Sequence, residues 1–435
     1  NPRMGSTATP CYQLNTYDPA QAIVRRGYSL GGFIQDSWKP LDWLTIVPGL
    51  RIDYGTAQNS LGEVVQNLLG FGPRLGINID LTRDNKTVLK FAYGRSNEVV
   101  TLLTTSSADA TPLNQTWQWN RATNRFDGFY TSSGGANGYD LKGRCTDGPN
   151  KGQSTVECGN AALSLTPPHA DFFTFALERE LAANIAGSIT YTYRKLSFLW
   201  EDIELNARFT LNGGNIYDFG DRRYGGIYGY RPVADSYRRY NGIDFVINGA
   251  PSANWAFFVA YTLSWLEGTS DDQIGIFRDD PPRDFRLRGY LADDHRHTVK
   301  ANGSYSWRGL TIGVNMAYLT GGPASRLYLQ PIGYSYGFYA WRGIDPNADP
   351  NDVRKWTELR SPDIMNIDLR LQYDAHALIK QHLSFIVDIF NSLDLTTPNG
   401  GSFQFGFENR NATTYGQVTA RQTPLRVQLA VRYQY

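Results

Sequence analysis

The sequence contains no long apolar run. Its 435 residues have a mean hydropathy of −0.41, and nowhere do about 18 or more apolar residues follow one another. Because a membrane-spanning helix needs such a stretch, the sequence excludes a helical membrane protein. Residues 1–40 also lack the charged start and apolar core of a secretory signal peptide. We therefore expect the chain to begin inside a longer precursor.

The sequence also has no excess of positive or of negative charge. Lys and Arg total 42 while Asp and Glu total 41, so the sequence carries no basic footprint for nucleic acid. Only 5 His are present, and no Ser-His-Asp grouping, phosphate-binding glycine loop or Cys/His zinc spacing stands out. We expect no nucleic-acid partner, no cofactor and no enzymatic activity.

Cysteine is scarce, with 3 residues in the chain. Cys145 and Cys158 lie 13 positions apart in a segment rich in Gly, Ser, Thr and Asn. This spacing predicts a loop disulfide in an oxidising compartment. The alternative is a pair of free thiols in a soluble loop. Cys11 is left over, and a residue upstream of the chain could pair with it.

Aromatic residues and glycine are abundant, and apolar residues alternate with polar ones. From Leu425 to Tyr435 the odd positions are apolar, while Arg426 and Arg432 fall among the even ones. Two arginines on one face exclude a strand that is buried on both sides. The same alternation predicts thirteen strands, most of which reach the about 9–11 residues needed to cross a bilayer. Their approximate spans are 26–38, 41–55, 73–82, 86–98, 170–182, 185–200, 236–249, 254–267, 295–307, 309–321, 363–375, 381–393 and 424–435.

Short and long connections between these strands alternate without exception. The long ones are 56–72, 99–169, 201–235, 268–294, 322–362 and 394–423. This order predicts an all-β fold, a transmembrane antiparallel up-and-down β-barrel with long extracellular loops and short periplasmic turns. Residues 1–25 would then be an extracellular loop segment, and residues 26–435 the C-terminal part of the barrel. A soluble β enzyme is the least favoured alternative, because the aromatic column from Trp255 to Trp265 would lie in water.

Thirteen is an odd number of strands, whereas bacterial single-chain barrels have even numbers. An open sheet would also leave two unpaired edges in lipid, which is not tolerated. We therefore expect an odd number of further strands on the N-terminal side.

Four stretches of the chain resemble a known family. They are 31–95, which starts with GGFIQDSWKPLDWLTIVPGLRIDYG and ends with FGPRLGINIDLTRDNKTVLKFAYGR; 172–195, FFTFALERELAANIAGSITYTYRK; 293–323, DDHRHTVKANGSYSWRGLTIGVNMAYLTGGP; and 384–394, SFIVDIFNSLD, with the terminal PLRVQLAVRYQY. The chain resembles the C-terminal barrel of TonB-dependent outer-membrane receptors. It is closest to the Oar-like branch, which has an N-terminal carboxypeptidase-regulatory-like domain.

The resemblance implies a multi-pass protein of the bacterial outer membrane that transports a ligand with energy coupled through TonB. Barrels of the family have 22 strands, so nine strands, a plug domain and the TonB box would precede Asn1. The implied partners are outer-membrane lipid and lipopolysaccharide, the barrel assembly machinery, and TonB through the missing N-terminal part. One alternative is a scaffold or adhesive barrel that binds a surface protein, and another is a passive porin.

Three groups of residues are candidates for functional roles. Residues 99–169 form the largest loop, and its aromatic residues Trp117, Trp119, Phe126 and Tyr130 predict a ligand or partner surface. The terminal residues Leu429, Val431, Tyr433 and Tyr435 resemble the signal read by the barrel assembly machinery, although an ordinary lipid-facing strand has the same pattern. Charged residues on the polar strand faces are expected to point into the lumen and to dock the plug or line the substrate path: Arg51, Asp53, Arg74, Lys90, Asp368, Arg370, Arg426 and Arg432.

Two further clusters contain side chains that can bind a metal ion. Asp271, Asp272, Asp279 and Asp280 could bind calcium through carboxylate oxygens. Interleaved arginines and the absence of EF-hand spacing instead favour a solvated loop that pairs with itself. His295 and His297 form an H-x-H pair, but alternation places both on the outward face, which favours a polar rim over a metal site.

Overall fold

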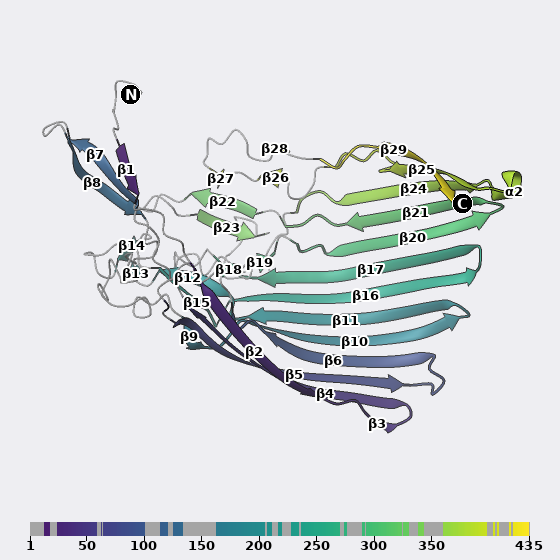
Figure 1. Cartoon of the computed structure of the whole chain (residues 1–435), viewed down its shortest axis with the longest axis horizontal. Coiled ribbons are helices and arrows are strands. Elements are labelled where there is room, and N and C mark those ends of the chain that lie inside the picture. The colour runs from purple at the N-terminus through teal and green to yellow at the C-terminus, as the bar shows by residue number, and fades with distance from the viewer. Residues whose placement is uncertain are drawn as a thin grey trace.

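The structure is a computed structural model. It describes residues 13–17, 24–58, 62, 64–100, 114–120, 125–133, 162–204, 207–210, 216–219, 228–234, 236–269, 274–275, 289–291, 293–323, 325–329, 338–342, 360–397, 403–404, 407–408, 417–418 and 421–434. Within these ranges the dominant feature is one large antiparallel sheet (Figure 1).

The main sheet is a meander in which each strand pairs with the next one along the chain. Three short strands attach beside this path: β3 (Trp38–Leu41) and β9 (Ala162–Leu165), which pair with β4 and β5, and β19 (Gly289–Tyr290), which pairs with β17. In order, the main strands are β2 (Arg26–Gln35), β4 (Leu44–Gln58), β5 (Val64–Asp80), β6 (Thr87–Asn97), β10 (His169–Ala182), β11 (Ile185–Ser197), β16 (Tyr237–Ser252), β17 (Trp255–Gly268), β20 (His297–Trp307), β21 (Leu310–Leu319), β24 (Ile364–Asp374), β25 (His382–Phe390) and β29 (Arg426–Gln434). All thirteen strands expected from the alternation are therefore present.

At one end of the sheet the strands are joined by tight turns. Between β20 and β21 the turn consists of Arg308 and Gly309, which have φ angles of 49° and 86°. Two successive positive φ angles define the hairpin turn whose twist matches that of the strands. Asn184 at φ 61° turns β10 into β11, and the short helix α2 (His376–Ile379) joins β24 to β25. No helix in the described ranges is long and apolar enough to span a membrane.

The opposite end carries the long connections, and these contain strands of their own. Strand β1 (Gln13–Tyr17) pairs with the hairpin of β7 (Asn114–Asn120) and β8 (Arg125–Ser133), which projects beyond the main sheet (Figure 1). The other small sheets at this end consist of β12 (Trp200–Glu204), β15 (Tyr228–Pro232) and β18 (Ile274–Gly275); β13 (Ala207–Thr210) and β14 (Ile216–Phe219); β22 (Ser325–Leu329), β23 (Phe338–Arg342) and β27 (Phe407–Glu408); and β26 (Phe403–Gln404) and β28 (Gln417–Val418).

The strands differ from the sequence-based prediction at two places in the chain. The prediction of a long loop at 56–72 is wrong, because β4 continues to Gln58 and β5 begins at Val64. Pairs such as Tyr54 with Leu69 and Ala57 with Gln66 extend the hairpin beyond the bilayer-sized segment. The expected strand 26–38 is interrupted at Asp36–Ser37 and resumes as β3.

Apolar side chains on one face of the sheet are exposed and do not pack into an interior. Leu429 is 74% exposed and Val431 65%, and Val427 and Phe385 on the same face are also exposed. Among the described residues the fully buried large side chains are few, and they lie toward the long-loop end, including Leu68, Leu199 and Trp200. A soluble β protein would bury these strand residues in a core, whereas a transmembrane sheet presents them to hydrocarbon.

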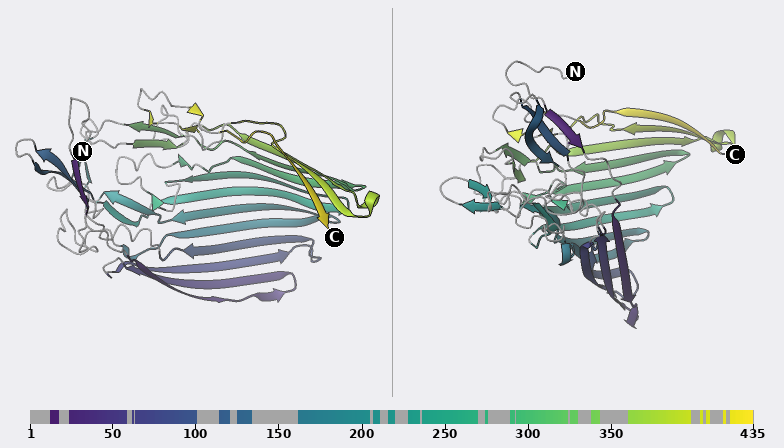
Figure 2. Two further views of the ribbon diagram at one scale, coloured as in Figure 1. Left: turned by 45° about the horizontal axis from the view of Figure 1, so that its top comes forward. Right: turned by 60° about the vertical axis from the view of Figure 1, so that its left-hand side comes forward.

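The sheet is curved, and its first and last strands form its two edges (Figure 2). Strand β2 pairs with β4 alone, and β29 pairs with β25 alone. All residues of both edge strands are exposed.

Candidate functional site

One face of the main sheet collects the charged side chains, and we call it the polar face. Residues that pair directly across two strands share a face. Asp53 pairs with Gly70, Lys90 with Ala176, and Arg370 with Asp388. Followed strand by strand, the register places all eight predicted lumen residues on this face: Arg51, Asp53, Arg74, Lys90, Asp368, Arg370, Arg426 and Arg432.

Most charges on the polar face have a partner. Arg370 binds Asp388 through two hydrogen bonds, Nε to Oδ1 at 2.6 Å and Nη2 to Oδ2 at 2.8 Å. Lys90 Nζ lies 2.7 Å from Glu178 Oε2. Two-point Arg–carboxylate contacts fix both groups in one geometry. These charges of the polar face are therefore held in ordered ion pairs.

The Asp53 carboxylate is held in a similar way at the other side of the sheet. Arg51 Nε donates to Asp53 Oδ1 at 2.7 Å, and the Asp53 residue is only 8% exposed. An added Cβ on Gly31 of the neighbouring strand would lie 2.5 Å from Arg51 Nη2. Glycine at this position therefore makes room for the ion pair.

A pocket of about 460 Å³ lies along β17, β20, β21, β24 and β25. Small residues such as Gly313 and Ser304 form part of its lining. Asp368 borders it, and its Oδ1 accepts hydrogen bonds from Asn366 Nδ2 at 2.8 Å and from the Asn391 backbone at 2.9 Å. The pocket also reaches the Arg370–Asp388 pair. A polar segment or ligand on this face would meet both fixed charge and open space.

Where loop 99–169 begins, the chain folds back over the polar face of β4 and β5. A Cβ on Gly55 would lie 2.2 Å from the Val99 carbonyl oxygen, and one on Gly70 would lie 2.5 Å from Asn97 Cγ. Contacts this close are possible only because both residues are glycine. Val99 is 8% exposed. Strand β9, near the far end of the same loop, pairs with β5 as well, so both ends of the loop rest on this hairpin.

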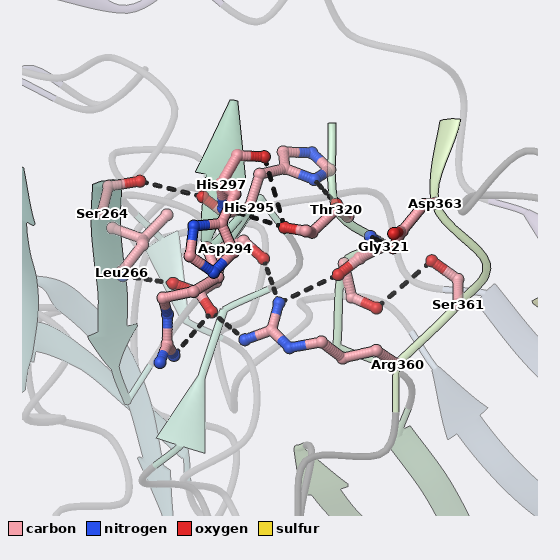
Figure 3. A network of polar contacts seen from close by, with 12 residues as sticks. Ser264, Leu266, Asp294, His295, His297, Thr320, Gly321, Arg360, Ser361 and Asp363 are labelled. Atoms are coloured by element: carbon pink, nitrogen blue, oxygen red, sulfur yellow. Dashed lines mark hydrogen bonds and ion pairs between the residues drawn. The ribbon is translucent and has the colours of Figure 1, made fainter. Parts of the chain in front are cut away.

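A network of polar contacts fixes the bases of two long loops at the rim of the sheet (Figure 3). Its centre is the carboxylate of Asp294, which is fully buried. The Leu266 backbone N–H donates to Asp294 Oδ1 at 2.6 Å, and the Arg360 guanidinium forms an ion pair with Oδ2. Arg360 Nη1 also donates to the carbonyl oxygens of Asp294 and Gly321, at 2.6 and 2.9 Å.

The same rim contains the two histidines. His295 Nδ1 donates to the Thr320 carbonyl oxygen over 2.6 Å. His297 lies on the apolar face, where its ring stacks on that of Tyr261 with a centroid distance of 6.1 Å. In the described part of the chain no three His, Cys, Asp or Glu residues gather in a way that could hold a metal ion.

Two carboxyl groups next to the strands have shifted pKa values. Burial raises the pKa of Glu98, which follows β6 where the chain folds over the polar face. In the turn between β5 and β6, a hydrogen bond from Thr82 Oγ1 at 2.5 Å and one from the Lys86 backbone lower the pKa of Asp84.

For some of the predicted residues the structure gives only the backbone position, and others lie outside the described residues. Trp117 and Trp119 are in β7, and Phe126 and Tyr130 are in β8, where Trp119 pairs with Phe126. Leu429, Val431 and Tyr433 lie on the apolar face of β29. Outside the described ranges are Cys11, Cys145, Cys158, Asp271, Asp272, Asp279, Asp280 and Tyr435.

Arg360 is the residue that sequence reasoning missed. It stands alone near the end of loop 322–362 and 66 positions from Asp294. Asp294 ends the acidic loop 268–294, in which interleaved arginines offer partners close by in the sequence. Arg296 does lie 3.5 Å from Asp294, but no local pattern indicates the second partner.

The fold and this distribution of side chains define an outer-membrane β-barrel protein. A family model described as the outer membrane beta barrel domain matches residues 55–328. The chain therefore belongs to the outer membrane beta-barrel domain family and lies in the outer membrane. A search of curated protein sequences found no match.

Solved structures with a similar fold are outer-membrane transporters and receptors, not enzymes. The outer membrane transporter YddB from Escherichia coli matches with a TM-score of 0.52 at 13% identity, over 94% of this chain and 45% of that one. The siderophore receptor PiuA from Acinetobacter baumannii gives 0.52 at 12% identity, over 95% and 44%. The pyoverdine receptor FpvA from Pseudomonas aeruginosa gives 0.52 at 14% identity, over 96% and 44%. The chain spans less than half the length of each.

Proposed function

We propose that this chain is the C-terminal part of the barrel of a TonB-dependent receptor that moves a ligand across the outer membrane. The observation that carries the proposal is the curved sheet with charged pairs on one face and an unpaired strand at each edge. Unpaired edges are not tolerated in lipid, so the barrel closes only with more strands. Closure at about 22 strands encloses a lumen that needs a plug.

The fixed charges of the polar face suit this role. Arg51–Asp53, Lys90–Glu178 and Arg370–Asp388 are ordered pairs on strands spread around the sheet. A folded plug would meet preorganised donors and acceptors there, and could be released when TonB deforms it. The Oar-like branch, with its N-terminal carboxypeptidase-regulatory-like domain, is our more specific proposal for the rest of the protein.

A second function has an observation in its favour. The strands β1, β7 and β8 form a small sheet of their own that projects beyond the main sheet (Figure 1). A projecting sheet in the long-loop region suits a scaffold that holds a surface protein. Such a protein would have no need of energy from TonB.

Two measurements on the full-length protein separate these functions. A TonB-dependent receptor should bind the purified periplasmic domain of TonB and show no steady conductance in planar bilayers. Steady conductance without TonB binding would replace the proposal with a passive porin. Neither conductance nor TonB binding would replace it with the scaffold.

The aromatic hairpin gives a separate test of ligand capture. Deleting residues 99–169 should abolish uptake or partner binding, because β7 and β8 carry Trp117, Trp119, Phe126 and Tyr130. The barrel should keep its heat-modifiable mobility on gels. A deletion variant that folds and still takes up ligand would contradict the assignment of this loop.

A further inference from the structure

Five charged residues form one row across adjacent strands on the apolar face, which we call the charge row. Arg95 of β6 pairs with Asp171 of β10, which pairs with Lys195 of β11. Lys195 pairs with Arg239 of β16, and Arg239 with Glu267 of β17. These five strands lie side by side in the sheet (Figure 1). The register therefore places all five charges in one row perpendicular to the strands.

The row lies at the edge of the apolar region and not within it. Two residues farther along each strand toward the short turns, the same face carries Tyr93, Phe173, Tyr193, Asn241 and Trp265. A two-residue step along a strand is about 7 Å. The charge row is thus at the boundary between water and hydrocarbon, on the side of the long loops. In outer-membrane barrels that side faces the outer leaflet.

Two of the three cations in the row are matched by carboxylates. Arg95 binds Asp171 through two hydrogen bonds of 2.8 Å, and Tyr93 donates to the same carboxylate at 3.0 Å. Arg239 forms an ion pair with Glu267.

Lys195 lies between these pairs without a carboxylate of its own. Its Nζ is 5.8 Å from the centre of the Tyr237 ring, and no ion pair of Lys195 occurs among the residues the structure describes. Of its two direct cross-strand neighbours, Asp171 is already bound by Arg95. The other, Arg239, has the same sign as Lys195, and like charges in opposite positions destabilise a strand pair. The row therefore carries an excess positive charge that an anion would stabilise.

An apolar pocket of about 350 Å³ opens on the same face. It begins two residues from the charge row, on the side of the short turns. It is lined mainly by the rings of Phe91, Phe173, Phe175, Tyr191 and Tyr193. The Phe173 ring centre is 4.7 Å from that of Tyr93 and 5.9 Å from that of Tyr193. An aromatic pocket on a lipid-facing surface suits an acyl chain.

We propose that the charge row and this pocket bind one phosphorylated glycolipid of the outer leaflet. A headgroup phosphate would pair with Lys195 and Arg239, and one acyl chain would occupy the pocket beneath. The row crosses five strands, a width of about 19 Å at the usual strand spacing. That width fits a headgroup with several acyl chains better than a two-chain phospholipid. The proposal rests on the family and the membrane orientation, and not on TonB-dependent transport.

Binding of diphosphoryl lipid A to the full-length protein in detergent tests the site. Native mass spectrometry would measure the lipid retained per protein. Lys195→Ala should weaken retention about fivefold, the usual effect of one cation at an anionic lipid surface. Charge reversal by Lys195→Glu should weaken it further. Phe173→Ala should also reduce retention, because it removes a wall of the pocket.

The matched control is Arg179→Ala. Arg179 lies on the apolar face of β10, the strand that carries Phe173 and pairs with the β11 strand of Lys195, but at the short-turn end, in the other leaflet. This variant should retain lipid A like the unchanged protein, and heat-modifiable mobility would verify that all variants are folded. Equal loss in the Lys195 and Arg179 variants would overturn the site, as would no loss in either. Equally strong retention of phosphatidylglycerol would overturn the choice of a glycolipid.

Discussion

Arg360 reaches across the base of its loop to the fully buried carboxylate of Asp294, 66 positions earlier in the chain (Figure 3). One guanidinium nitrogen pairs with the carboxylate, and the other donates to the carbonyl oxygens of Asp294 and Gly321. These contacts tie the ends of loops 268–294 and 322–362 to each other and to Gly321, two residues after β21 ends. The long loops are therefore anchored at their base.

Arg360→Ala should destabilise this rim strongly. The change leaves a buried carboxylate with Arg296 as its nearest cation, at 3.5 Å, and breaking a buried pair typically costs about 3–5 kcal/mol. We expect a lower midpoint temperature in heat-modifiability gels. The double variant Asp294→Asn with Arg360→Gln should recover part of the loss, because no charge is then left buried. An unchanged midpoint in Arg360→Ala would contradict the role of the pair.

Gly55→Ala should disturb the place where loop 99–169 folds over the polar face. A Cβ at Gly55 would lie 2.2 Å from the Val99 carbonyl oxygen, so the backbone must move. We expect a loss of about 1–3 kcal/mol, measured by urea unfolding in detergent. Gly32→Ala is the control, since a Cβ there meets nothing within 4 Å. Equal effects of the two changes would show that the close approach is unimportant.

The Glu98→Gln variant should change stability in a pH-dependent way. Burial raises the pKa of Glu98 in the folded protein, so the charged form is the unfavourable one. Below the unfolded pKa both states are protonated and no penalty exists. The penalty grows as the pH rises through the raised pKa. The variant should therefore have a higher midpoint temperature than the unchanged protein at pH 8, and an equal one at pH 4.

The Asp84→Asn variant should change stability in the opposite direction at high pH. Hydrogen bonds lower the pKa of Asp84 in the folded state, so its charge stabilises the turn above the unfolded pKa. This contribution disappears as the pH falls through the lowered pKa. At pH 8 the Asn variant should be slightly less stable than the unchanged protein. A gain in stability for Asp84→Asn at pH 8 would show that the hydrogen bonds do not favour the carboxylate.

The strands were predictable because their signal is local. In β17 and β29 apolar and polar positions alternate residue by residue, since one face meets hydrocarbon and the other does not. The alternation of apolar and polar residues did not predict the strands between residues 56 and 72. There β4 and β5 continue beyond the apolar region, and glycines such as Gly55 and Gly70 break the alternation because another segment lies over them.

The rim network was not predictable for a different reason. Its residues come from the ends of separate loops, and their meeting is set by the order of the strands. His295 and Thr320, or Arg360 and Asp294, have no shared local pattern. The charge row was not predictable from its turns alone. A turn at Ala183-Asn184 pairs Ala182 with Ile185, and that register would place Asp171 opposite Leu196. An irregularity between Glu180 and Ala182 shifts the register by one residue and brings Lys195 opposite Asp171.

A charge placed on each face of β29 gives the clearest test of the membrane orientation. Leu429 lies on the apolar face and pairs with Val387, while the adjacent Gln428 lies on the polar face and pairs with Asp388. Leu429→Arg should cost about 2–4 kcal/mol, because the guanidinium must enter hydrocarbon. Gln428→Arg should cost little, since that side chain faces polar groups. Unfolding by urea in lipid vesicles would measure both. If the two variants lose equal stability, the two faces of the sheet do not meet different solvents, and the transmembrane interpretation fails.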